Sequence, residues 1–206
     1  MKKTIQDHID TLETSFNLIA TKRQTLLQNC AHSISKQLTE KSSSEIIVIC
    51  THNSRRSQLA ELWITLASMH YKLNSISSFS GGSESTAFNH RMVNALIDFG
   101  LEFNLKQAGK NPQYIVTIDE EKHKQHCFSK IYNHSFNPQK DFIAILVCHS
   151  ADEACPTIFG AAERFFVPYV DPKRADDTDE EKSAYADKVM EIGREMLYMM
   201  SKVKVE

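Results

Sequence analysis

The sequence lacks a long apolar run, since no stretch approaches the roughly 20 apolar residues that span a bilayer. The first eight residues turn polar where a secretory leader needs its apolar segment, so we expect a cytoplasmic protein. An excess of one charge is also lacking: 24 basic side chains face 26 acidic ones, and the net charge of −2 gives no electrostatic reason to bind nucleic acid or an anionic membrane. The five cysteines are expected to be catalytic, redox-active or inert rather than joined in structural disulfides.

Glycine and proline are absent from the first 44 residues, which carry apolar side chains at helical spacing. With 206 residues and 41% apolar content, the chain can bury one good core, and we divide it into a helical extension (1–44) and a main domain (45–206). The extension is predicted to form one long helix or two, packed on the domain. A homodimer seam through these helices is the alternative, although Arg23 interrupts the stripe.

Beyond the extension, apolar strands alternate with amphipathic helices, which predicts an α/β fold with a four-stranded parallel sheet flanked by helices. Strands are expected at Ile46–Ile49, Ser77–Gly82, Phe142–Val147 and Phe165–Val170. Helices are expected at Arg56–Ser68, from Asn89 to Gly100, and from near Thr178, where Thr178 and Glu181 have the spacing of a capping box. Between these elements, Tyr114–Ile118 and Cys127–Tyr132 are expected to pair as a hairpin.

The loop after the first predicted strand carries the strongest chemical signal. Cys50 and Arg56 are six positions apart at a strand-to-helix junction, and the backbone between them can wrap a tetrahedral oxyanion with its N–H groups. The following helix adds the positive end of its dipole, and the planar guanidinium of Arg56 can grip two oxyanion oxygens. These positive surroundings favour the thiolate form of Cys50, which predicts a nucleophile inside an oxyanion site. The residues expected to bind the oxyanion are Thr51, His52, Asn53, Ser54, Arg55 and Arg56.

Two further reactive residues, Cys148 and Asp171, also follow predicted strands directly. The carboxyl ends of parallel strands lie along one edge of a sheet, where open α/β folds place their sites. Cys50, Cys148 and Asp171 are therefore expected to converge in space although they are far apart in the sequence.

A second pair of thiols, Cys148 and Cys155, lies seven positions apart. On a regular helix that spacing corresponds to roughly 10 Å, whereas a disulfide needs Cα atoms within about 7 Å. Pro156 also disfavours a helix through this segment. We interpret the thiols as a redox pair on a segment, about 148–162, that changes conformation; two unrelated buried cysteines are the alternative.

The stretch from Cys50 to Ser57 resembles the signature of the low-molecular-weight protein tyrosine phosphatase superfamily, which is Cys, five residues, Arg, then Ser or Thr. That superfamily includes phosphatases and thioredoxin-coupled arsenate reductases. Gln58 stands where the phosphatases usually have proline, which resembles the reductase branch. His52 replaces a usual glycine and Arg55 a usual cysteine. The resemblance covers residues 45–103 and 142 onward, so 104–141 is interpreted as an insertion.

The spacing of Cys148 and Cys155 matches the resolving thiols of these reductases. The resemblance therefore implies reduction of arsenate to arsenite without a tightly bound cofactor. Cys50 attacks arsenate while Asp171 assists the departure of hydroxide, Cys148 then attacks Cys50, and Cys155 resolves the disulfide, which thioredoxin reduces. Arg56 would hold the substrate throughout.

Supporting roles are also implied by the resemblance. Ser57 would hydrogen-bond the Cys50 thiolate, and Asn53 would hold the shape of the loop. Asn53, Glu61 and Ser80 fall where some relatives place a potassium ion, and the other residues give no metal site.

Two other functions remain open at this point. A phosphatase acting on phosphotyrosine or a small phosphate ester would use Cys50, Arg56 and Asp171, the last followed by Pro172 as in the superfamily's general acid. Lys173 and Arg174 replace the tyrosines that usually follow, which weakens that interpretation. An oxyanion sensor of low catalytic power, contacting a partner through its N-terminal helices, is the third possibility.

Overall fold

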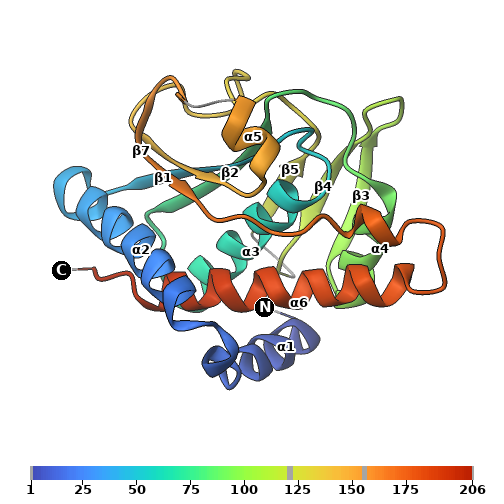
Figure 1. The fold of residues 1–206 in the computed structure, drawn as a ribbon, viewed down its shortest axis with the longest axis horizontal. Coiled ribbons are helices and arrows are strands. Elements are labelled where there is room, and N and C mark those ends of the chain that lie inside the picture. The colour runs from blue at the N-terminus through green and yellow to red at the C-terminus, as the bar shows by residue number, and fades with distance from the viewer. Residues whose placement is uncertain (1, 120–122, 155–156, 206) are drawn as a thin grey trace.

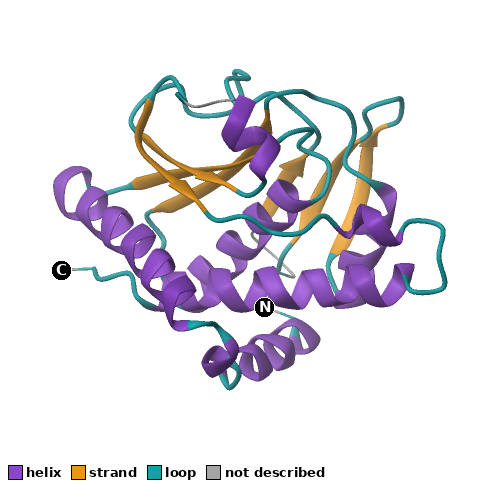
Figure 2. Cartoon of the chain, in the orientation of Figure 1, coloured by secondary structure: helices purple, strands orange, loops and turns teal. Residues whose placement is uncertain are grey.

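The computed structural model describes residues 2–119, 123–154 and 157–205 (Figure 1). Its centre is the predicted four-stranded parallel sheet, with strand order β2-β1-β6-β7 and helices around it (Figure 2). The strands are β1 (Ser44–Cys50), β2 (Ile76–Gly82), β6 (Phe142–Leu146) and β7 (Ala161–Phe166). In β1 the side chains Ile46 to Ile49 are all fully buried, as expected for an inner strand covered on both faces.

The main domain contains helices near the three predicted positions and one short helix, at His149–Ala154, that was not predicted. They are α3 (Arg56–His70), α4 (His90–Phe99), the short α5 (His149–Ala154) and the long α6 (Glu181–Ser201). The Asn89 side chain caps α4 by accepting a hydrogen bond from the Arg91 amide, and Gly100 ends it with a φ of 118°. α3 packs on β1 and β2, and α6 packs on α3, so the loop between β1 and α3 is fixed at both ends.

The N-terminal extension forms two helices, α1 (Lys3–Glu13) and α2 (Thr21–Lys41), joined by the 3₁₀ turn η1 (Phe16–Leu18). Both pack against α6, and Figure 1 shows them beside it. Their apolar stripe is buried in the same core as the sheet, including Ile5, Ile9, Leu12, Leu27 and Ile34. Arg23, which interrupts the stripe in sequence, donates to Glu195 on α6 at 2.9 Å and to the Pro168 carbonyl at 3.1 Å. The extension thus packs on the domain within one chain.

Residues 102–127 form a second sheet, antiparallel, with order β3-β4-β5. Its strands are β3 (Glu102–Gln107), β4 (Gln113–Thr117) and β5 (Lys124–Cys127). A hairpin in this region was predicted, with Cys127–Tyr132 as its second strand. In the structure the second strand is β5, which ends at Cys127 instead of beginning there, and Cys127 pairs with Tyr114 of β4. β3 was missed, since its side chains are mostly exposed and show no apolar pattern.

Two other predicted boundaries are wrong. The fourth strand is β7, Ala161–Phe166, rather than Phe165–Val170. After it, the Val167 and Tyr169 amides still donate to the Leu146 and Val147 carbonyls, but Pro168 between them has no N–H to continue the ladder. The last helix begins at Glu181 rather than near Thr178, and the capping box is absent. The Thr178 hydroxyl accepts from the Glu180 amide at 3.3 Å, while the Glu181 carboxylate accepts from the Asp177 amide at 2.8 Å.

No helix in the described part of the chain is both long and apolar enough to cross a membrane.

Candidate active site

Cys50 is the last residue of β1, and Arg56 is the first residue of α3. The Cys50 side chain is buried, and its Sγ lies 3.1 Å from Ser57 Oγ in the first turn of that helix. The thiol therefore lies at the helix N-terminus, where unpaired backbone N–H groups and the helix dipole favour negative charge. Ser57 has the position from which it can hydrogen-bond a thiolate.

The loop from residue 51 to 55 turns its carbonyl groups outward. Each carbonyl from residue 50 to residue 54 accepts a hydrogen bond from a group outside the loop or from the following helix. The donors, in chain order, are Ser83 N, Glu84 N, Ser129 Oγ, Gln58 Nε2 and Asn89 N. The backbone N–H groups of residues 51–56, in contrast, donate to no acceptor within the described residues. Outward carbonyls and unused N–H groups are the arrangement of an anion-binding nest. The loop has the geometry that an oxyanion site requires.

Asn53 holds the shape of this loop through its side chain. It has a positive φ of 45°, which asparagine tolerates better than most residues. Its Nδ2 donates to Ser57 Oγ at 2.9 Å, and its Oδ1 accepts from the Lys130 amide at 2.9 Å. His52, which stands where the superfamily usually has glycine, does not have a positive φ. The histidine is accommodated because the left-handed conformation falls on the next residue.

Two residues between β5 and β6, Ser129 and Lys130, support the loop from outside, and neither was predicted. Ser129 Oγ donates to the His52 carbonyl at 2.8 Å and accepts from the Thr86 amide at 2.8 Å. Lys130 supplies the amide that binds Asn53, and both residues are buried. A short polar pair after a strand has no motif, so its role becomes visible only in the folded chain.

The Arg56 side chain binds the segment that carries Asp171. Its Nη1 donates to the Tyr169 carbonyl at 2.9 Å, and its Nη2 donates to Asp171 Oδ2 at 2.7 Å. Its Nε is buried and has no acceptor within the described residues. A buried N–H without a partner costs about 1–3 kcal/mol, so a bound oxyanion would relieve a cost that the free protein carries.

Cys148 follows β6 directly after Val147 and reaches the same loop. Its side chain is buried, and its Sγ lies 3.3 Å from Thr51 Oγ1, on the residue next to Cys50. The predicted convergence of Cys50, Cys148 and Asp171 at one edge of the sheet is therefore seen in the structure. Cys155 and Pro156 lie outside the described residues.

Arg55 contacts the protein rather than open space. Its Nε donates to Tyr185 OH at 2.7 Å, and its Nη2 donates to Asp176 Oδ2 at 3.0 Å. The same Tyr185 hydroxyl donates to Asp176 Oδ1 at 2.7 Å. Burial, together with the hydrogen bond to Asp176, raises the pKa of Tyr185 to about 12, so the hydroxyl keeps its proton. The Arg55 side chain is therefore committed to Tyr185 and Asp176 through Nε and Nη2.

The three potassium candidates do not fit a potassium ion well. Glu61 Oε2 and Ser80 Oγ are buried without a well-formed hydrogen bond among the described residues, although the Ser80 hydroxyl acts on the Glu61 carboxylate and favours its charged form. Both atoms of the Asn53 amide, however, are already bonded to Ser57 and to Lys130. Burial raises the pKa of Glu61, and the nearby positive charge of Lys130 opposes that shift, so a cationic group already serves this carboxylate. No step below passes through a metal.

The two remaining described thiols are Cys30 and Cys127. Both are free and buried, and burial raises the pKa of Cys30 to about 12 and that of Cys127 well above its usual value. A thiol that stays protonated is a poor nucleophile, so neither joins the chemistry.

The fold of this chain is found in other solved structures. Solved low-molecular-weight protein tyrosine phosphatases share the fold: the one from T. tengcongensis has a TM-score of 0.53 with 14% identity, covering 78% of this chain and 100% of its own. The one from Vibrio cholerae has a TM-score of 0.51 with 14% identity, covering 77% and 95%.

In sequence the chain is similar to curated arsenate reductases. One from Halalkalibacterium halodurans is 29% identical over 150 residues, which are 72% of this chain and 89% of the relative. One from Bacillus subtilis is 28% identical over 152 residues, covering 73% and 91%. No family model matches the chain. The predicted resemblance to arsenate reductases of the low-molecular-weight phosphatase superfamily is confirmed, in fold by the phosphatases and in sequence by the reductases.

Proposed function

We propose that this protein reduces arsenate to arsenite through its own thiols. The observation that carries the proposal is a second buried thiol at the oxyanion loop, Cys148, whose sulfur lies 3.3 Å from Thr51 Oγ1 beside the nucleophile. A phosphatase needs only Cys50, Arg56 and an acid, whereas a reduction needs a further thiol to supply electrons. The similarity to proteins named arsenate reductase supports the same choice.

The first step is nucleophilic. Cys50 thiolate, supported by Ser57 Oγ, attacks the arsenic of a bound arsenate and forms a sulfur–arsenic bond, while one arsenate oxygen departs. Asp171 donates the proton that turns the departing oxygen into water or hydroxide. The backbone N–H groups of the loop and the guanidinium of Arg56 hold the remaining oxygens and stabilise their negative charge.

The second step transfers the electrons. The Cys148 thiolate attacks Cys50 Sγ, a Cys50–Cys148 disulfide forms, and the sulfur–arsenic bond breaks. Its electron pair stays on arsenic, which leaves as arsenite with arsenic reduced from +5 to +3. Cys155 then attacks Cys148, freeing Cys50 and leaving a Cys148–Cys155 disulfide, which a thioredoxin dithiol reduces by exchange. The two thiols that end as a disulfide supply the two electrons.

Single-turnover and multiple-turnover assays test this relay. Cys148→Ser and Cys155→Ser should each stop multiple turnovers of arsenate reduction in the presence of thioredoxin, thioredoxin reductase and NADPH. Cys155→Ser should still complete one turnover and accumulate a Cys50–Cys148 disulfide that mass spectrometry of peptides detects. Cys30→Ser is the matched control, since that thiol is buried on α2 with Arg23 and Glu163 as its charged neighbours, and it should turn over normally. Normal turnover of both relay variants would disprove the thiol relay.

Phosphate-ester hydrolysis is the second candidate, favoured by the position of Asp171 beside Arg56 and by the fold of the phosphatases. It shares the attack by Cys50 and replaces the electron transfer with hydrolysis of a thiophosphate. Cys148→Ser should leave such hydrolysis unchanged, whereas Cys50→Ser should abolish hydrolysis and reduction alike. Fast turnover of aryl phosphates together with no arsenate reduction would favour this candidate.

A further inference from the structure

The segment that carries Asp171 is held at both ends by two consecutive arginines. Asp171 precedes the 3₁₀ turn η2 (Pro172–Ala175), and Asp176 follows it. Arg56 binds Asp171 at 2.7 Å, and Arg55 binds Asp176 at 3.0 Å. Both arginine side chains are largely buried, and Asp176 is 16% exposed, so the Arg55–Asp176 pair is shielded from the solvent that weakens surface ion pairs. Asp171 is 34% exposed, so its pair with Arg56 is shielded less.

The two pairs are not equally available during the reaction. Arg56 has to turn N–H groups toward the oxyanion, and Asp171 has to carry a proton to act as an acid. Either event removes the charge-assisted bond at the Asp171 end. The Arg55–Asp176 pair takes part in neither event and can persist, and Arg55 Nε also lies 4.0 Å from Asp171 Oδ1.

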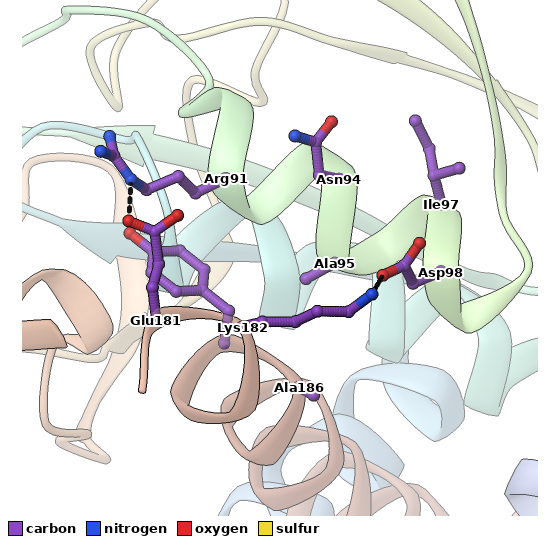
Figure 3. A pocket seen from close by; sticks show the side chains of 9 residues that line it. Arg91, Asn94, Ala95, Ile97, Asp98, Glu181, Lys182 and Ala186 are labelled. Carbon is purple, nitrogen blue, oxygen red and sulfur yellow. Dashed lines mark hydrogen bonds and ion pairs between the residues drawn. The ribbon is translucent and has the colours of Figure 1, made fainter. Parts of the chain in front are cut away.

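The Arg55–Asp176 pair is also supported by more neighbouring side chains than the Arg56–Asp171 pair. Tyr185 OH accepts from Arg55 and donates to Asp176, which closes a ring of three side chains. Arg91 of α4 adds pairs with Asp177 at 2.5 Å and with Glu181 at 2.7 Å. Figure 3 shows Arg91 and Glu181 at one wall of a cavity of about 370 Å³ between α4 and α6, which contains no residue of the Cys50 loop. These supporting contacts therefore belong to the scaffold rather than to the substrate site.

We propose that Arg55 is a positioning residue for the general acid: through Asp176 and Tyr185 it keeps the segment 171–176 against the oxyanion loop when Arg56 engages the substrate. This inference rests on the proposed function, because it needs Asp171 to act as the acid. It also gives a role to the arginine that stands where the superfamily usually has cysteine.

Leaving-group dependence tests the inference, since protonation matters for a poor leaving group and hardly for a good one. The test measures phenol release in the first turnover of phenyl phosphate and of dinitrophenyl phosphate. Arg55→Met should slow phenyl phosphate by about 10- to 100-fold and dinitrophenyl phosphate by less than about 3-fold, because general acid catalysis contributes roughly 10²–10⁴-fold. Arg55→Lys should not rescue, since a point charge cannot bind Tyr185 and Asp176 together. Tyr185→Phe should change the ratio in the same direction by a smaller factor.

Arg194→Met is the matched control: Arg194 is also half-buried and donates to a hydroxyl, Ser15 Oγ, at 2.8 Å, away from the acid segment. Its ratio should equal that of the unchanged protein. Asp171→Asn separates the two hypotheses. If Asp171→Asn loses phenyl phosphate selectively and Arg55→Met slows both substrates equally, Arg55 is structural and the inference is wrong. If Asp171→Asn shows no selective loss, the acid role itself is wrong, and the inference falls with it.

Should Arg55→Met fail to fold, Asp176→Asn tests the same contact with little change of size. Hydrogen exchange of the amides 173–176 in the presence of phosphate provides a readout without turnover. Faster exchange there in Asp176→Asn, with unchanged exchange in Arg194→Met, supports the tether. Equal exchange in both variants overturns it.

Discussion

Gly82 is the residue whose replacement should most directly disturb the oxyanion loop. It ends β2 beside Cys50, and it lacks a positive φ, so room rather than backbone freedom explains the glycine. A Cβ at this position would lie 2.2 Å from the Glu84 carbonyl oxygen, 2.5 Å from that of Thr51 and 2.9 Å from the Asn53 nitrogen. All three are backbone atoms, which cannot rotate away as a side chain can.

The size of the effect follows from these distances. A contact of 2.5 Å is about 0.9 Å inside ordinary packing, which begins at 3.4 Å, so Gly82→Ala should push the loop outward by about that much. Displacements near 1 Å cost about 10²-fold in rate when they affect groups that orient a substrate. We therefore expect kcat/KM for arsenate to fall by about 10- to 100-fold, with weaker binding of phosphate as a competing oxyanion.

The assay compares Gly82→Ala with Gly193→Ala. The second variant creates an equally severe contact, 2.4 Å from the Trp63 ring, but between α6 and α3 and away from the loop. Both should lower the midpoint of thermal unfolding, followed through Trp63, the single tryptophan of the chain. Only Gly82→Ala should lose phosphate affinity, measured by calorimetry. Unchanged affinity and kcat/KM in a folded Gly82→Ala protein would refute the account of the loop.

Three other outcomes can be measured on the same protein. Arg56→Lys should lower kcat/KM for arsenate by at least about 10²-fold, because it loses charge-assisted bonds worth roughly 1.5–3 kcal/mol each, and activity within tenfold of the original would contradict the bidentate grip. Burial raises the pKa of Glu61, so the folded chain binds this proton more tightly than the unfolded chain does. The free energy of unfolding of the original protein should therefore fall, relative to that of Glu61→Gln, as pH rises above the ordinary pKa of 4.5. An equal pH dependence of urea unfolding in both proteins would contradict this. Hydrogen exchange across 148–162 should differ between the reduced protein, in which α5 is helical, and the oxidised protein, and identical protection would argue against movement of the relay thiols.

The sheet could be predicted because its strands carry their own signal. The run from Ile46 to Ile49 is apolar at every position, as an inner parallel strand must be, and Asn89 and Gly100 mark the ends of α4 by their chemistry. β7 was misplaced because it lies at the edge of the sheet, where its first half carries the exposed residues Ala162 and Glu163 and no apolar run, while the segment after it is more apolar. Strand boundaries at an edge depend on pairing, which the sequence shows poorly.

Some residues of the candidate site could be predicted from the sequence and others could not. Cys50, Arg56 and Ser57 are close in sequence, so a local motif predicts them, and the order of strands predicts the approach of Cys148 and Asp171. Ser129 and Lys130 could not be found, since they act through one hydroxyl and one backbone amide across 77 residues of chain. Any residue can supply an amide, so such a contact leaves no mark in the sequence.

The two departures from the superfamily's motif have opposite consequences in the structure. His52 is tolerated because Asn53 takes the left-handed conformation, and its ring, 54% exposed, makes an exposed pair with Glu84 at 3.7 Å. Arg55 instead creates contacts, since it joins the loop to α6 through Tyr185 and to the acid segment through Asp176. A substitution that leaves its side chain in solvent should be replaceable, whereas one that links three elements should not. His52→Gly should therefore leave the leaving-group ratio unchanged, while Arg55→Met alters it.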